Sequence, residues 1–132
     1  MRLDVQIDFD GNCEAAFKVY EACLGGTITF MLTYGASPTA TSYPGLESKI
    51  AHATMEVGGH TLIGVDVASH LYQPPKGFRM LLNLDDAEDA RRMFAMLAED
   101  GVVMMPLQKT FWAEHYAVLT DRFGVPWKIN CA

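Results

Sequence analysis

Charged, amide and aromatic side chains that could bind a small molecule recur at alternate positions of several predicted strands. Alternation places every second side chain on one face of a strand, so we expect these residues to line one pocket. The set comprises Asp4, Gln6, Asp8, His52, Thr54, Arg79, Trp112, Tyr116, Lys128 and Asn130. The two cations would hold an anionic or polar-aromatic ligand, which would stack on the rings. Alternatively, Asp4 or Asp8 neutralises Arg79 or Lys128, and the ion pairs only fill the pocket.

Two of the four histidines are candidates for a general base, because imidazole titrates near neutral pH. His52 shares a predicted strand face with Thr54, and His115 lies near the start of a later strand. No two histidines have the i, i+4 spacing of a helical metal site. A hydrogen-bonded structural role is the alternative for both, so the sequence assigns no catalytic residue.

Composition and charge limit the class of protein. The 132 residues suffice for one domain. The formal net charge of −6 opposes binding to a phosphate backbone, so we expect no nucleic-acid partner. No apolar run is long enough to span a membrane and the start has no signal-peptide core, so we expect a cytoplasmic protein. Cys13, Cys23 and Cys131 form no CxxC pair, and we expect inert structural roles for them.

The elements that must position these side chains occur twice. In the first copy we expect strands at 5–9, 27–34, 50–57 and 61–67 and a helix from Cys13 that Gly25-Gly26 ends. In the second copy we expect strands at 80–84, 102–108, about 115–120 and about 126–131, and a helix that Asp85 caps and Gly101 ends. Residues 36–48 are rich in Ser, Thr, Pro and Gly and form either a lid or an ordinary loop.

One copy alone would bury too little apolar surface to be stable. We therefore expect a single domain at 1–132, with module one at about 1–68, a linker at about 69–77 and module two at about 78–132.

Five motifs resemble one family. They are Phe9–Phe17, Ala51–Ala53, Gly58-Gly59, the TFWA sequence at Thr110–Ala113 and the DRFGVPWKIN sequence at Asp121–Asn130. They resemble the PhnB-like group of the vicinal oxygen chelate superfamily, which includes glyoxalase, bleomycin-resistance and dioxygenase proteins. Members of this group are often labelled 3-demethylubiquinone-9 3-methyltransferases. That label gains no support here, because no strand leads into a glycine-rich nucleotide-binding turn and the chain is short.

The resemblance implies an α+β fold in which two tandem βαβββ modules form an open, U-shaped, eight-stranded mixed sheet. Helices would cover the convex face, and the concave face would hold the pocket. The resemblance also implies a homodimer, because homodimers are usual in the superfamily and some members exchange modules.

Metal-dependent members of the superfamily use four ligands, two from each module, which are typically His, Gln or Glu. The resemblance places these positions at Asp4, Ile63 or Gly64, Arg79 and Lys128. Ile63 and Gly64 offer no side-chain ligand, and two cations would repel a metal ion. A shifted alignment reaches Gln6, but near Lys128 it offers only Trp127 and Ile129. We therefore expect no cofactor, and a divalent metal is disfavoured.

Three functions remain open. The favoured one is a metal-independent small-molecule binding protein with an aromatic and cationic concave pocket. The second is a metal-dependent lyase, dioxygenase or isomerase like other members of the superfamily. The third is a metal-free enzyme in which His52 or His115 acts as general base and Arg79 stabilises an oxyanion.

Overall fold

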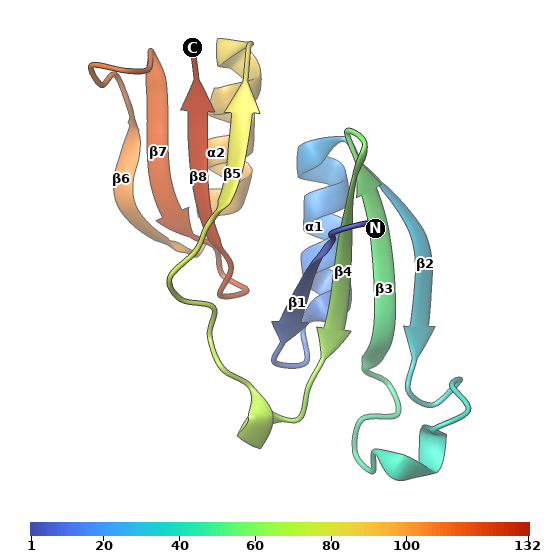
Figure 1. Ribbon diagram of the computed structural model, residues 1–132. Helices are drawn as coiled ribbons and strands as arrows, with labels where there is room; N and C mark the ends of the chain where they lie inside the picture. The colour runs from blue at the N-terminus through green and yellow to red at the C-terminus, as the bar shows by residue number, and fades with distance from the viewer. The chain divides into compact units, whose positions relative to one another are not determined.

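The computed structural model describes every residue from Met1 to Ala132 and divides into two compact units, 1–73 and 74–132. From here on module one means 1–73 and module two means 74–132, so the segment predicted as a linker at 69–77 is divided between them. Each contains a strand, a helix and three further strands in that order (Figure 1). The α+β class and the two tandem βαβββ modules are therefore confirmed, with the eight strands divided between two four-stranded mixed sheets. No helix is long and apolar enough to cross a membrane.

Module one contains one helix and four strands. They are β1 (Val5–Phe9), α1 (Cys13–Leu24), β2 (Thr27–Thr33), β3 (Ile50–Val57) and β4 (His60–Asp66). The strand order is β1-β4-β3-β2, in which β1 runs parallel to β4 and the other neighbours are antiparallel. Short 3-10 helices lie at Ala40–Ser42, within the long connection between β2 and β3, and at Ser69–Leu71.

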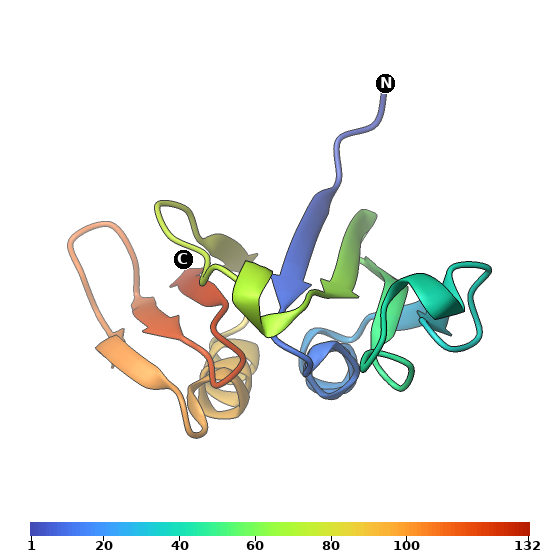
Figure 2. The same cartoon turned by 90° about the horizontal axis from the view of Figure 1, so that it is seen from below.

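Module two repeats this topology. Its elements are β5 (Met80–Leu84), α2 (Ala87–Ala98), β6 (Val102–Gln108), β7 (His115–Thr120) and β8 (Pro126–Cys131). The strand order is β5-β8-β7-β6, and β5 runs parallel to β8. In both modules the helix covers one face of its own sheet, as the end-on view of the helices shows (Figure 2). We call the other face of each sheet its open face.

Each helix packs through one apolar stripe, as its periodicity predicts. The helix α1 buries Cys13, Ala16, Phe17, Tyr20 and Cys23. Phe17 lies so close to β4 that a Cβ at Gly64 would come within 2.6 Å of its ring. The helix α2 buries the smaller set Ala90, Met93 and Leu97.

The ends of α1 lie where the sequence predicts them, and those of α2 do not. Gly25 ends α1 in the left-handed conformation, with φ of 70°. The cap of α2 is Asp86 rather than Asp85, because the Asp86 carboxylate accepts a hydrogen bond from the Glu88 amide at 2.8 Å. Gly101 does not end α2, which stops at Ala98. Gly101 instead allows close approach of the chain to β7, since a Cβ there would lie 2.5 Å from the Thr120 carbonyl oxygen.

Candidate functional site

The open face of module one carries polar side chains from β1 and β3. Ile7 and Phe9 are buried beneath α1, so Gln6 and Asp8 point to the open face. The same alternation along β3 buries Ala53 and Met55. It therefore places on the open face the predicted residues His52 and Thr54, together with Glu56.

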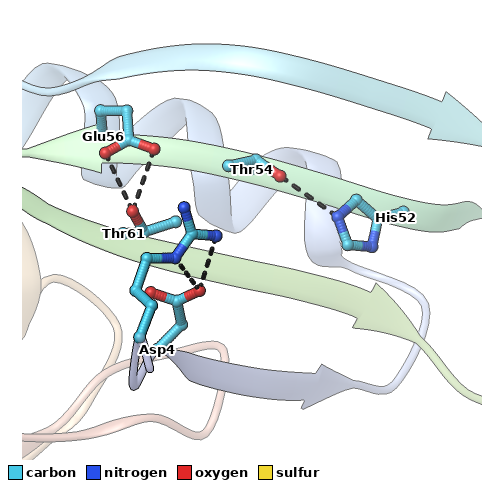
Figure 3. A network of polar contacts seen from close by, with 6 residues as sticks. Asp4, His52, Thr54, Glu56 and Thr61 are labelled. Atoms are coloured by element: carbon cyan, nitrogen blue, oxygen red, sulfur yellow. Dashed lines mark hydrogen bonds and ion pairs between the residues drawn. The ribbon is translucent and has the colours of Figure 1, made fainter.

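Contacts on this face join neighbouring side chains in pairs (Figure 3). The Thr54 hydroxyl and His52 Nε2 lie 3.2 Å apart, and the ring of Phe30 meets the imidazole edge-on at 5.8 Å. The Thr61 hydroxyl donates to the Glu56 carboxylate, whose two oxygens lie 3.0 and 2.9 Å away. The structure thus brings together His52 and Thr54.

Asp4 lies just before β1 and its partner is a neighbour in the sequence. Arg2 Nε donates to its Oδ2 at 2.9 Å, and the two charges form an ion pair. Neither this pair nor the Glu56–Thr61 pair was predicted from the sequence. The alternation of His52, Thr54 and Glu56 along β3 was the signal that could have identified Glu56.

The open face of module two carries the other predicted residues. Trp127 and Ile129 of β8 are buried toward α2, so Lys128 and Asn130 point to the open face. In the strand register Asn130 is flanked by Tyr116 on β7 and by Asn83 on β5.

His115 lies on the other side of the same sheet. It pairs with Cys131 and shares a face with Ala117, which is fully buried beneath α2. His115 therefore does not accompany Lys128 on the open face, and nothing in the geometry of module two favours it as a general base there.

Arg79 and Lys128 are held by different contacts. Arg79 Nη1 donates to the Leu119 carbonyl oxygen at 3.1 Å. Lys128 Nζ lies 5.9 Å from the centre of the Tyr116 ring, a cation–π distance. The ring of Trp112 packs edge-on against Tyr116, with 5.0 Å between centroids. The structure thus brings together Trp112, Tyr116 and Lys128.

Asn130 lacks one hydrogen bond. Its Nδ2 donates to Asn83 Oδ1 at 3.2 Å, while its own Oδ1 is buried and has no partner. An unsatisfied buried amide atom is uncommon in proteins and calls for a reason.

A hollow of about 870 Å³ opens within module two at the start of β5. Its lining consists of residues 74–79, Leu81, Met104, Thr120, Gly124, Pro126 and Lys128. Lys76, Arg79 and Lys128 are cationic, and no carboxylate belongs to the lining. No ion pair joins any of the three to a carboxylate within module two. The hollow therefore has a net positive charge that is available to a ligand.

The inherited metal positions do not fit a divalent ion. Ile63 pairs with Thr54 and Gln6 and shares their open face, whereas Gly64 faces α1, so the second position is the hydrocarbon Ile63. Arg79 and Lys128 would repel the ion. Within neither module do three or more His, Cys, Asp or Glu side chains form a group that could hold a metal.

The DRFGVPW motif forms a structural turn. Asp121 is 5% exposed, and its Oδ1 accepts from the Phe123 amide at 2.9 Å and the Val125 amide at 3.0 Å. Its Oδ2 accepts from the Trp127 indole at 2.9 Å. Phe123 and Trp127 are both buried. The motif thus fixes the β7–β8 turn, and its rings pack inside module two.

The cysteines are placed as inert groups. All three are free and buried. Burial raises the pKa of the Cys13 thiol well above its usual range, and the nearby Asp66 and Glu14 carboxylates raise it further. Cys13 therefore has no thiolate character at neutral pH.

Comparison with known proteins places this fold and its motifs in a family. The chain is 32% identical to the protein YjdN of Escherichia coli K12, over 98% of this chain and 95% of YjdN. The crystal structure of protein PA1353 from Pseudomonas aeruginosa has 41% identity and a TM-score of 0.90, covering 99% of this chain and 97% of PA1353.

The PhnB protein of Bacillus cereus, described as a 3-demethylubiquinone-9 3-methyltransferase, shares the fold with a TM-score of 0.88 at 23% identity, over the full length of both chains. The family model for the glyoxalase/bleomycin resistance protein/dioxygenase superfamily matches residues 7–129. The chain belongs to the glyoxalase/bleomycin resistance protein/dioxygenase superfamily and resembles its PhnB-like members.

Proposed function

We propose that this protein binds a small anionic molecule on the open face of module two and needs no metal ion to do so. The observation that carries the proposal is the hollow that contains Lys76, Arg79 and Lys128 and no carboxylate. Opposite charges about 4 Å apart attract by about 1 kcal/mol in water and by several times more near a protein surface. Three cations therefore supply enough attraction for a small anion.

The contacts of Arg79 suit this role. A guanidinium group has five N–H donors, and Arg79 uses one of them on the Leu119 carbonyl. That bond fixes the plane of the group and leaves donors for a carboxylate or phosphate. Leu81 and Met104, two half-exposed apolar side chains of the lining, lower the local dielectric constant and strengthen the attraction.

The predicted ligand contacts of module one, namely Asp4, Gln6, Asp8, His52 and Thr54, stay a separate prediction for the open face of that module and are not part of the anion site. The proposal also includes a homodimer in the cytoplasm, which rests on the family resemblance. Sedimentation equilibrium tests the dimer, and a single species at monomer mass across concentrations would contradict it.

Isothermal titration with inorganic phosphate and with benzoate tests the anion site. Replacing Arg79 by Gln should weaken binding about tenfold or more, since a hydrogen bond to a charged group contributes about 1.5–3 kcal/mol. The matched control is Lys109→Gln, which removes one positive charge from an exposed side chain elsewhere in module two. The control should change the dissociation constant less than twofold. Equal weakening by both variants, or no binding of either anion, would contradict the proposal.

A further inference from the structure

A second group of side chains lies on the open face of module two, outside the lining of the hollow. Trp112 and Tyr116 pack edge-on with 5.0 Å between ring centroids, and Tyr116 is buried beneath this contact. Trp112 is 52% exposed, so much of its indole is accessible. Asn130 is the register neighbour of Tyr116 and has a buried amide oxygen with no partner. These groups suit a flat, polar-edged part of a ligand rather than an anion.

The distance between the cations of the hollow and the aromatic rings can be estimated along β7. Arg79 is anchored at the Leu119 carbonyl, and Leu119 lies three residues beyond Tyr116 along β7. At about 3.3 Å per residue, the guanidinium and the ring are about 10 Å apart along the sheet. Lys128 connects the two sets, because it lines the hollow and its Nζ lies 5.9 Å from the Tyr116 ring.

One hydrogen bond is missing at the Asn130 amide whichever way its oxygen and nitrogen are assigned. If both amides of the Asn83–Asn130 pair are turned over, the same single bond forms and the Asn130 nitrogen loses its partner instead. In either orientation one amide atom beside Tyr116 lacks a hydrogen bond. A hydroxyl on a bound ring could provide it, because a hydroxyl both donates and accepts.

We propose that the ligand is an elongated anion with a flat aromatic end about 10 Å from its charged group. The charged group binds Arg79 and Lys76, the linker passes Lys128, and the ring packs against the exposed face of Trp112, beside Tyr116, with a polar edge toward Asn130. This inference rests on the proposed function, since it takes the anion site of module two as one end of the ligand.

The test uses three probes: inorganic phosphate, pentyl phosphate and 5-phenylpentyl phosphate. We expect the phenyl group to tighten binding about five- to tenfold over pentyl phosphate, the usual range for an aromatic contact. Phenyl phosphate, whose ring cannot reach Trp112 while its phosphate binds Arg79, should show no such gain. Equal affinity of the two pentyl compounds would overturn the inference.

Variants assign the gain to the rings. Trp112→Ala should remove the advantage of the phenyl group and leave phosphate binding unchanged. Tyr43→Ala is the matched control, because Tyr43 is 44% exposed and lies outside both sheets. It should preserve the advantage. If Trp112→Ala weakens phosphate and 5-phenylpentyl phosphate equally, the ring subsite does not exist.

Two further outcomes separate the inference from the proposed function. If phosphate binds in an Arg79-dependent way and the phenyl group adds nothing, only the ring subsite is wrong. If no probe binds, both are wrong. A 3-hydroxyphenyl analogue that binds more tightly than the phenyl compound, and loses that gain in Asn130→Ala, would support the amide contact; an equal gain in Asn130→Ala would contradict it.

Discussion

The two modules share one topology and carry opposite charges on their open faces. In module one the open-face side carries Asp8 and Glu56, together with Asp4, whose charge is paired with that of Arg2. In module two the hollow carries Lys76, Arg79 and Lys128. Burial beneath each helix fixes the alternation of apolar residues, whereas residues on the open face are free of that constraint. The comparison teaches that the repeat preserved the fold while its open faces diverged.

The modules also anchor their helices differently. In module one the N-cap Asn12 makes no side-chain cap, and the first amide of α1, that of Cys13, donates to Asp66 Oδ1 at 2.9 Å. Asp66 is the last residue of β4, and its Oδ2 also accepts from the Ile50 amide at 2.8 Å. In module two the corresponding last residue of β8 is Cys131, and Asp86 caps α2 locally.

A third difference is in the packing of helix on sheet. Gly64 pairs with the third residue of β1, and Ile129 pairs with the third residue of β5. A large ring, Phe17, covers the glycine. In module two α2 buries smaller side chains, so a larger residue on the sheet maintains the packing density.

The largest effect should come from Asp121, which holds the β7–β8 turn of module two. Asp121→Ala leaves two amides and the Trp127 indole without their acceptor, so we expect a loss of about 4 kcal/mol in the free energy of unfolding. Urea denaturation measures it. Asp121→Asn, which keeps one acceptor oxygen, should lose clearly less. A loss under about 1 kcal/mol for the alanine variant would show that the turn does not depend on this carboxylate.

The next effect tests the two helix anchors directly. Asp66→Ala removes two buried hydrogen bonds and should cost about 3 kcal/mol. Asp86→Ala removes one exposed cap and should cost about 1 kcal/mol. Urea unfolding of the two variants under the same conditions gives the difference. Equal losses would mean that the long-range anchor of α1 is no stronger than the local cap of α2.

Smaller effects should follow from changing one methyl group in each module. Gly64→Ala brings a Cβ into the Phe17 ring and Cys13 Sγ and should cost about 2 kcal/mol by overpacking. Ile129→Val leaves a small cavity beneath α2 and should cost about 1 kcal/mol. Thermal unfolding of both variants tests this. If Gly64→Ala is neutral, Phe17 is not packed against the sheet as closely as the structure indicates.

The smallest effect should be a loss of stability of module one at alkaline pH. Burial raises the pKa of the Cys13 thiol, and burial together with nearby Tyr43 and Asp66 raises the pKa of Tyr34. Both groups are neutral below their unfolded pKa values of about 8.5 and 10, so their contribution is fully present there and is lost as pH rises. At about pH 9.5 the thiol should account for a loss of about 1 kcal/mol.

The control for this prediction is Cys13→Ala, which should show a flatter stability profile between about pH 8.5 and 10. Urea unfolding at each pH provides the comparison. An identical profile in the variant and the parent protein would show that the Cys13 thiol does not titrate in this way.

Periodicity predicted most of the fold. The strands at 50–57, 80–84 and 102–108 begin and end where expected. Along 50–57 the signal is burial on one face, which leaves a period of two in the sequence, whereas 80–84 and 102–108 follow from their places in the repeat. The predicted ends of α2 were wrong by one or more residues. At its start, several consecutive acidic residues can cap a helix, and only the backbone conformation selects Asp86.

Less of the candidate site could be predicted from the sequence. The alternation identified Arg79 and Lys128, but it could not identify Lys76 or the segment around it, which has no period. His115 was a candidate for its imidazole alone, and the register puts that residue on the α2 face. The role of Asp121 depends on three bonds closed by a turn, and a sequence motif does not reveal them.

The central claim is that the anion site belongs to module two and not to module one. Amide chemical-shift mapping during titration of the isotopically labelled full chain with inorganic phosphate tests it most directly. We predict saturable shifts at residues 76–81 and 120–128 and none on the open-face strands β1 and β3. Shifts centred on β1 and β3, or shifts spread without saturation over both modules, would contradict the account.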